Sequence, residues 1–464
     1  MNKKLVALGV ASAFALPLAA QAQTANVTLY GRANVDLEFV NGTTCRSPLS
    51  QGNSGGFAGS TTANGPVGPA AGNQIITNCP NPPATSTDSF YNTATSNPTV
   101  TRLSSNSSRI GVRGTESLGG GLNAIFQMEA NVSWDTGNAS SSGLASRETF
   151  VGLQGSWGRV TMGKFLMPQD DLHPIFGNAP TLTTSILSTA DVWAQGNLSK
   201  GQGGWDARTG NNIRYDTPNW AGFTAAIQAS TRDDSGNTTQ TPYGGDNGDH
   251  PSNVRHAWVI GGNVIYSNGP LQLGGAFESN RNVRQYQAVT GFFGSQACSA
   301  TNPCVMNADD YDWTLTGAYD FGTLFQGFGL KLGAAYEQTK YDTPSGDLKR
   351  NFWAVSGTVP IGAGKLYLFF GKASNGKGGA ADGETVGYVV HGSNTATRQW
   401  EITYSYSMSP RTMLYTGYVK LLNDQYNPTT FNINSYAIST CKFGDSSCSQ
   451  GRPGGFVLGL VHFF

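Results

Sequence analysis

Apolar and polar side chains alternate with a period of two along much of this chain. In the segment VTLYGRANVDLEF, residues 27–39, every odd-numbered position is apolar or small and every even-numbered position is polar or carries a tyrosine. This period predicts β-strand, because successive side chains of a strand point to opposite faces. A soluble β-sandwich would alternate in the same way, but its strands are usually about five or six residues long. The length of this segment therefore favours a membrane barrel.

The segment YDWTLTGAYDF, residues 311–321, adds a second signal. Its outer face carries aromatic rings at both ends, with Tyr311 and Trp313 at one end and Tyr319 and Phe321 at the other. Ten steps of about 3.3 Å, tilted by about 40°, cover roughly 25 Å, the height of the lipid-facing band of an outer-membrane barrel. The opposite face, Asp312 to Asp320, suits a watery lumen. The segment QWEITYSYSM, residues 399–408, repeats this arrangement.

Sixteen segments of this kind predict an all-β fold, a sixteen-stranded antiparallel transmembrane β-barrel. They are residues 26–40, 100–117, 121–135, 146–155, 158–165, 211–218, 222–232, 254–266, 270–281, 310–321, 327–341, 350–360, 364–373, 398–408, 412–423 and 454–464. Short Gly/Pro-rich turns follow the even-numbered strands. Long polar connections follow the odd-numbered ones, including 41–99, 166–210, 282–309, 374–397 and 424–453. Such asymmetry is typical of barrels with short periplasmic turns and long extracellular loops.

The first residues predict a cleaved secretory signal peptide at 1–22. They combine Lys3 and Lys4, an apolar stretch, and the small-x-small sequence Ala20-Gln21-Ala22, which is the order of a signal and its cleavage site. A membrane anchor is the alternative, but the apolar run of about 15 residues is shorter than the roughly 20 needed to span a bilayer. The expected mature domain is the barrel, residues 23–464.

The composition agrees with a chain of strands and turns. Charged residues make up 12% of the sequence, about half the usual share, and the 61 glycines are about twice the usual share. The 29 basic and 29 acidic residues balance. No overall field therefore favours a nucleic-acid partner.

Six cysteines in an exported chain favour disulfides. The simplest connectivity joins three local pairs, each within one loop-like segment: Cys45 with Cys79, Cys298 with Cys304, and Cys441 with Cys448. A metal site is the alternative, but the sequence has no C-x-x-C and no histidine doublet of zinc spacing.

The sequence offers no enzymatic motif. Its five histidines are scattered, and neither G-x-S-x-G nor H-E-x-x-H occurs. The glycine-rich GTESLGGG is not followed by the Lys-Ser or Lys-Thr of a phosphate-binding loop. We therefore expect no catalytic residues, no metal and no cofactor.

Several arginines fall on the predicted lumen face. These are Arg32, Arg109, Arg113, Arg147 and Arg214. Any one of them could be a solvated side chain without a role. Fixed positive charges gathered on one inner surface, however, raise a barrier to cations and favour anions.

Six segments, in order along the chain, resemble serial motifs of the Gram-negative general porins, the trimeric diffusion channels, and most of all their β-proteobacterial branch. They are LYGRANVDLEF, SRIGVRGTESLGGGLNAIFQME, RETFVGLQGSWGRVTMGKF, IRYDTPNWAGF, RTMLYTGYVK and the terminal GLVHFF. The likeness extends from residue 27 to residue 464, interrupted by loops.

This resemblance implies that the third loop, residues 166–210, folds into the pore and narrows it. It also implies that Arg32, Arg109 and Arg147 line the constriction. Arg214 is a fourth candidate, because its position in the alternation of its strand places it on the lumen face. The family commonly places carboxylates opposite, in a third-loop PEFGGD. Here residues 174–179 read PIFGNA, so both acidic positions are absent. Asp170 and Asp171 are the candidates to replace that charge.

The predicted function is passive diffusion of small hydrophilic solutes and ions through a weakly anion-preferring outer-membrane channel. The resemblance implies a homotrimer in contact with lipid and lipopolysaccharide, and a terminal Phe464 read by the barrel-assembly machinery. An adhesin or surface antigen is one alternative, given the long first loop at 41–99. A substrate-specific channel with saturable binding is another.

Overall fold

The computed structural model describes most of the chain, and the statements below concern these residues. They are 26–42, 61–62, 65–66, 99–137, 144–177, 185–195, 204–230, 258–281, 308–324, 329–432, 438, 441, 443–444 and 450–464. The predicted signal, residues 1–22, lies outside them. Cys441 is disulfide-bonded, but the other five cysteines lie outside the described residues, so the three pairings stay predictions.

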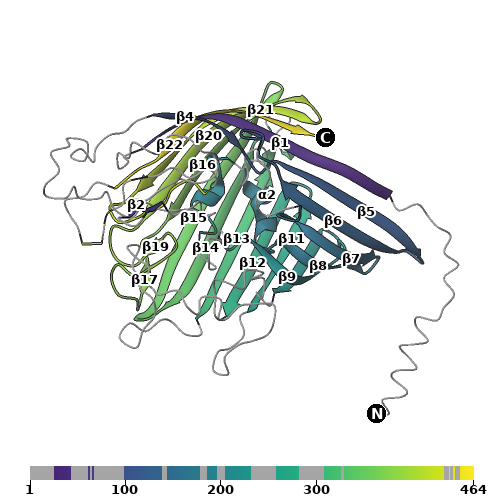
Figure 1. Ribbon diagram of the computed structural model, residues 1–464, viewed down its shortest axis with the longest axis horizontal. Coiled ribbons are helices and arrows are strands. Elements are labelled where there is room, and N and C mark those ends of the chain that lie inside the picture. Colours follow the sequence, from purple (N-terminus) through teal and green to yellow (C-terminus); the bar gives the residue numbers. More distant parts are fainter. Residues whose placement is uncertain are drawn as a thin grey trace, which may run out of the picture.

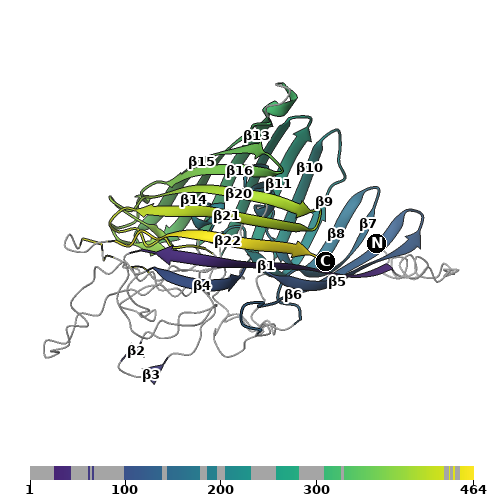
Figure 2. The same cartoon turned by 90° about the horizontal axis from the view of Figure 1, so that it is seen from above.

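Sixteen antiparallel strands form one closed sheet, if β4 and β5 are counted as one interrupted strand (Figures 1 and 2). The predicted fold class is therefore confirmed. The strands are β1 (Asn26–Asn41), β4 (Val100–Ser105), β5 (Arg109–Gly119), β6 (Leu122–Asn131), β7 (Thr149–Gly155), β8 (Gly158–Leu166), β9 (Arg208–Asp216), β10 (Phe223–Ser230), β11 (Trp258–Asn268), β12 (Leu271–Arg281), β13 (Asp309–Asp320), β14 (Lys331–Thr343), β15 (Gly346–Ile361), β16 (Gly364–Ala373), β20 (Thr397–Ser409), β21 (Thr412–Asn423) and β22 (Gly454–Phe463).

The connections hold only short elements among the described residues. The helices are η1 (Asp170–Leu172), α2 (His173–Phe176), η2 (Thr189–Asp191) and η3 (Phe321–Thr323). The short strands are β2 (Thr61–Thr62), β3 (Gly65–Pro66), β17 (Lys377–Gly378), β18 (Thr385–Val386) and β19 (Val389–Val390). None of the helices in the described part of the chain is long and apolar enough to cross a membrane.

The first and last strands close the barrel. β1 pairs with β22 from Arg32 opposite Phe463 to Asn41 opposite Gly454, and on its other side with β4 and β5. Tyr415 of β21 strengthens this closure: its ring lies over Gly459 of β22, and its hydroxyl reaches Asn34 Oδ1 at 2.9 Å. A closed sheet leaves no unpaired edge in the bilayer.

Two details differ from the predicted strands. The predicted strand 100–117 is interrupted at residues 106–108, where Ser107 has a φ of 50° and the Ser108 hydroxyl bonds both the N–H and the carbonyl of Asn34, each at 2.9 Å. The side chain thus replaces the backbone ladder at this break. The connection from β14 to β15 follows an odd-numbered strand but is a tight turn, with Thr343 opposite Gly346.

The alternation read from the sequence matches the two faces of the barrel. On β13 the odd-numbered side chains point outward, and Leu315 is 56% exposed, whereas Asp312 and Thr314 are fully buried. Exposed apolar side chains continue around the outer face, among them Leu29, Val151, Ile227, Val264, Trp353, Ile402 and Leu458. This outer belt is the surface expected to face lipid.

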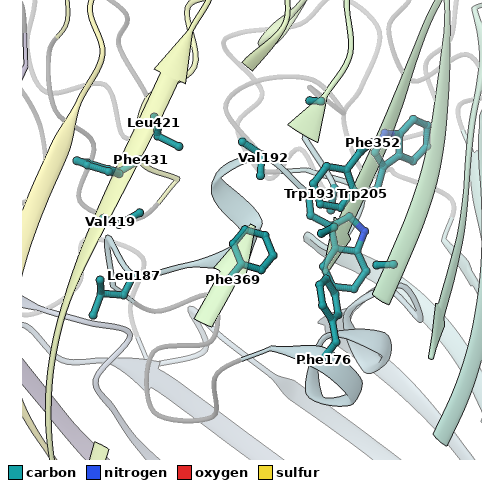
Figure 3. Close-up of a cluster of buried hydrophobic side chains, with 14 of the residues drawn as sticks. Phe176, Leu187, Val192, Trp193, Trp205, Phe352, Phe369, Val419, Leu421 and Phe431 are labelled. Carbon is teal, nitrogen blue, oxygen red and sulfur yellow. The ribbon is translucent and has the colours of Figure 1, made fainter. Parts of the chain in front are cut away.

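The connection from β8 to β9, residues 167–207, is called the third loop below. Its described parts lie against the inward-facing side chains of the barrel, and α2 contacts β12, β13 and β14. Figure 1 shows α2 among these strands. The main buried apolar cluster is therefore inside the barrel, between this loop and the wall (Figure 3).

Candidate functional site inside the barrel

Two inward-facing glycines allow α2 to lie close to the wall. A Cβ on Gly274 of β12 would be 2.7 Å from Ile175 Cδ1 of α2, and one on Gly333 of β14 would be 2.7 Å from Phe176 Cβ. Side chains do not approach so closely, so any larger residue at these positions would displace the loop.

Aromatic rings fill the space between the third loop and the wall. The Trp193 ring lies 4.6 Å from that of Phe176 and is stacked 6.4 Å from that of Phe352. The Trp205 indole N–H donates to the Tyr341 hydroxyl at 2.8 Å. Figure 3 shows the rings of Phe176 and Trp193 from the loop beside that of Phe352 from β15. Burial of this apolar area holds the loop in place.

Carboxylates and amides of the wall hold the polar groups of the loop. Gln169 Nε2 donates to Asp312 Oδ2 and Thr314 Oγ1, both at 2.7 Å. The Ala194 N–H donates to Glu337 Oε1 at 2.8 Å, and the Ser185 hydroxyl donates to Asp36 Oδ2 at 2.8 Å. The face from Asp312 to Thr316, predicted to meet a watery lumen, is thus covered by the loop. These bonds satisfy buried polar atoms of both segments, which suits an anchor.

One carboxylate of the loop itself also acts as an anchor. Burial raises the pKa of Asp191 well above its ordinary value. Its Oδ1 accepts the backbone N–H of Asn432 at 2.7 Å. This bond connects the third loop to the long connection that follows β21.

The opposite wall carries the predicted arginines. Arg32 and Arg109 are directly opposite each other in the β1–β5 register. Glu129 of β6 lies between two arginines, 3.4 Å from Arg109 Nε and 2.5 Å from Arg147 Nε. Tyr30 donates to the same carboxylate at 3.1 Å. The structure therefore brings Arg32, Arg109 and Arg147 to one patch, with a carboxylate that the sequence analysis had not singled out.

Arg113 and Arg214 have different surroundings. Arg113 lies over the Tyr30 ring, 4.9 Å from its centroid, and no carboxylate among the described residues pairs with it. Arg214 is paired twice, with Asp171 at 2.5 Å and with Asp216 at 2.8 Å. Asp171 of the third loop thus pairs with an arginine of the barrel wall.

Asp170 does not point to the arginine patch. It lies within the third loop beside His173 and Asp206. Its burial there raises the pKa of Asp170 to about 7.

We call the arginine-bearing inner surface of β5–β9 and of the adjoining start of β1, up to Arg32, the basic wall. Within the described residues it carries seven arginines: Arg32, Arg109, Arg113, Arg147, Arg159, Arg208 and Arg214. Their acidic partners on this wall and on the loop are Glu129, Glu148, Asp216 and Asp171. Sequence reasoning missed Arg159, Arg208 and the wall carboxylates, although strand parity would have placed Glu129 on the face that carries Arg109.

A comparison of the sequence with family models decides what kind of barrel this is. The model of the Gram-negative porin family matches residues 7–426. The chain belongs to this family. The match covers all strands but the last, with the intervening loops.

Individual relatives agree with this membership. Outer membrane porin protein 32 of Delftia acidovorans is 29% identical over 77% of this chain and 84% of that protein. An outer membrane porin protein of Bordetella pertussis is 28% identical over 67% of this chain and 75% of that protein.

Solved structures show the same fold. An anion-selective porin from Comamonas acidovorans has a TM-score of 0.58 at 22% identity, covering 95% of this chain and 100% of that chain. A trimer form of OmpT from Vibrio cholerae has a TM-score of 0.55 at 14% identity, covering 95% of this chain and 99% of that chain.

Like its relatives, this porin is a channel of the Gram-negative outer membrane and not an enzyme. It provides a path for passive diffusion of small hydrophilic solutes and ions. The predictions of family, fold and location are confirmed.

Proposed function

We propose that this porin prefers anions, and that its constriction is the gap between the third loop and the basic wall. The observation that carries the proposal is the unequal placement of the charges. Carboxylates of β1, β13 and β14, such as Asp36, Asp312 and Glu337, lie beneath the loop as hydrogen-bond acceptors. The arginines lie on the basic wall, where Arg109 and Arg113 keep exposed surface while Arg32 and Arg147 are buried.

The charge count on the basic wall supports this preference. Seven arginines and four carboxylates among the described residues leave an excess of three positive charges. Fixed positive charge at a narrow point disfavours cations and attracts anions. The solved porin of Comamonas acidovorans that shares the fold is described as anion-selective, which is consistent with the proposal.

The reversal potential of the reconstituted channel under a KCl gradient tests the preference. We expect the wild type to favour chloride and the triple variant Arg32/Arg109/Arg147→Ala to lose most of that preference. Arg281→Gln is the control, because this arginine is exposed and pairs loosely with Asp309 at 3.9 Å, away from the basic wall. Cation preference of the wild type, or unchanged selectivity of the triple variant, would contradict the proposal.

The assembled form is proposed to be a homotrimer in lipid and lipopolysaccharide, with Phe464 as the signal for the barrel-assembly machinery. A trimer form is described for the OmpT that shares the fold.

Phe464 extends the last strand: its carbonyl accepts the Gly31 N–H at 2.9 Å, and its ring covers Gly31. Deletion of Phe464 should lower the yield of folded trimer in cells while the channels that do form keep their conductance. An unchanged yield would exclude the signal role.

The export signal and the loop disulfides belong to the same proposal. The mature protein should begin at Gln23 and contain the pairs Cys45–Cys79, Cys298–Cys304 and Cys441–Cys448. Mass spectrometry of the non-reduced protein from outer membranes checks both. A chain that retains residues 1–22, or a free thiol, would contradict it.

A further inference from the structure

The two ends of the third loop meet at a cluster that the channel function does not explain. Asp170 and His173 are three residues apart on the helical turn at the start of the loop, so their side chains share a face. Asp206 comes from the returning end, just before β9. The ligating side-chain atoms of all three lie within 4.8 Å of one another, and His173 Nε2 is 3.3 Å from Asp206 Oδ2.

His173 is the unusual member of this cluster. It is 1% exposed, and its ring packs 4.0 Å from that of Trp193. Its Nε2 faces the Asp206 carboxylate at 3.3 Å, and its buried Nδ1 has no hydrogen-bond partner. Since buried polar groups nearly always have a hydrogen-bond partner, a buried imidazole held between two carboxylates with one nitrogen unpartnered points to a ligand.

The ligating atoms of the cluster indicate which kind of ion it would bind. Two carboxylates and one imidazole suit a divalent transition metal, whereas Ca²⁺ and Mg²⁺ take oxygen ligands. Two ligand atoms bound about 2.0–2.1 Å from a tetrahedral Zn²⁺ lie about 3.3 Å apart, as Nε2 and Oδ2 do here. Three protein ligands would leave a fourth position for water.

We propose that Asp170, His173 and Asp206 bind a Zn²⁺-class ion that clips together the two ends of the third loop. The ion would close residues 170–206 into a ring and restrict the loop where it faces the basic wall. It would also add positive charge there. Metal occupancy thus stabilises the position of the loop.

Zn²⁺ titration of the folded, chelator-treated, detergent-solubilised protein, followed by calorimetry, tests the proposal. We expect one ion per chain, with affinity at least about tenfold weaker in His173→Gln and in Asp206→Asn, as loss of a ligand predicts. His391→Gln is the matched control, because His391 Nδ1 also lies 3.0 Å from a carboxylate, that of Asp382, but belongs to no three-ligand group among the described residues.

A second readout separates loss of metal from loss of fold. Zn²⁺ should raise the melting temperature of the wild type and of His391→Gln, but not that of a folded His173→Gln. Co²⁺ should give a visible absorption spectrum that His173→Gln lacks. Absence of stoichiometric binding to the wild type, or binding by His173→Gln equal to it, would overturn the proposal whatever the variants do to folding.

Discussion

The two inner walls of this barrel have the same alternating sequence pattern, but their inward-facing side chains have different roles. On β12–β15 the inward side chains include Asp312, Thr314 and Glu337, and the third loop covers them. On the basic wall Arg109 and Arg113 remain partly or well exposed. Under the proposed function, a charged residue on the lumen face is expected to contribute to ion selectivity only where it keeps contact with the pore water. Beneath the loop the same kind of residue anchors structure.

The largest effect is expected from crowding the covered wall. Gly333→Val would place carbon atoms where Phe176 of α2 lies, and overpacking of this kind costs about 1–3 kcal/mol or moves the loop. We expect a lower melting temperature and an altered single-channel conductance. Gly357→Val is the control, because a Cβ at Gly357 meets only Leu332 Cδ2 at an ordinary 3.6 Å. Equal effects of the two substitutions would show that contact with α2 is not the cause.

Loss of one polar anchor should have a smaller effect. Gln169→Leu removes the amide that donates to Asp312 and Thr314. Because it leaves a buried carboxylate with fewer donors, we expect a loss of stability of about 1 kcal/mol and a noisier open-channel current. The control is Gln338→Leu, whose amide bonds Asn351 at 3.0 Å away from the third loop. Thermal unfolding followed by gel mobility measures the difference, and a stable, quiet Gln169→Leu channel would argue against the anchor.

On the basic wall, Glu129→Gln should sharpen selectivity. The substitution removes the carboxylate between Arg109 and Arg147 and so adds one net positive charge. The reversal potential should shift toward stronger anion preference. Glu116→Gln, at an exposed position near the far end of β5, should leave it unchanged. An unchanged reversal potential would mean that Glu129 does not lie at the constriction.

The smallest effect is expected from Asp171→Asn. It removes the 2.5 Å partner of Arg214, but Asp216 still pairs with this arginine at 2.8 Å. The reversal potential should therefore move in the same direction as in Glu129→Gln, but by less. A larger shift than that of Glu129→Gln would place the narrowest point at β9 instead of at β1 and β5–β6.

The sequence by itself determined the barrel. A period of two leaves each side chain only two directions, so the outward Leu315 and the inward Asp312 could be assigned without coordinates. Strand boundaries were accurate at β16 and β21, where glycine and polar turn residues mark the ends. The serial motifs of the chain also sufficed to indicate the family.

Only the tertiary structure decided what the inward residues do. Parity places Asp312 and Arg109 alike inside the barrel, but it cannot say that Gln169 covers one while the other stays partly exposed. Glu129 between two arginines, and Asp206 beside His173, depend on segments far apart in the sequence that meet only when the barrel closes and the loop folds in. Periodicity is a local property, set by the backbone of one strand. Neutralisation of a charge depends on distances in space, and those are fixed by packing.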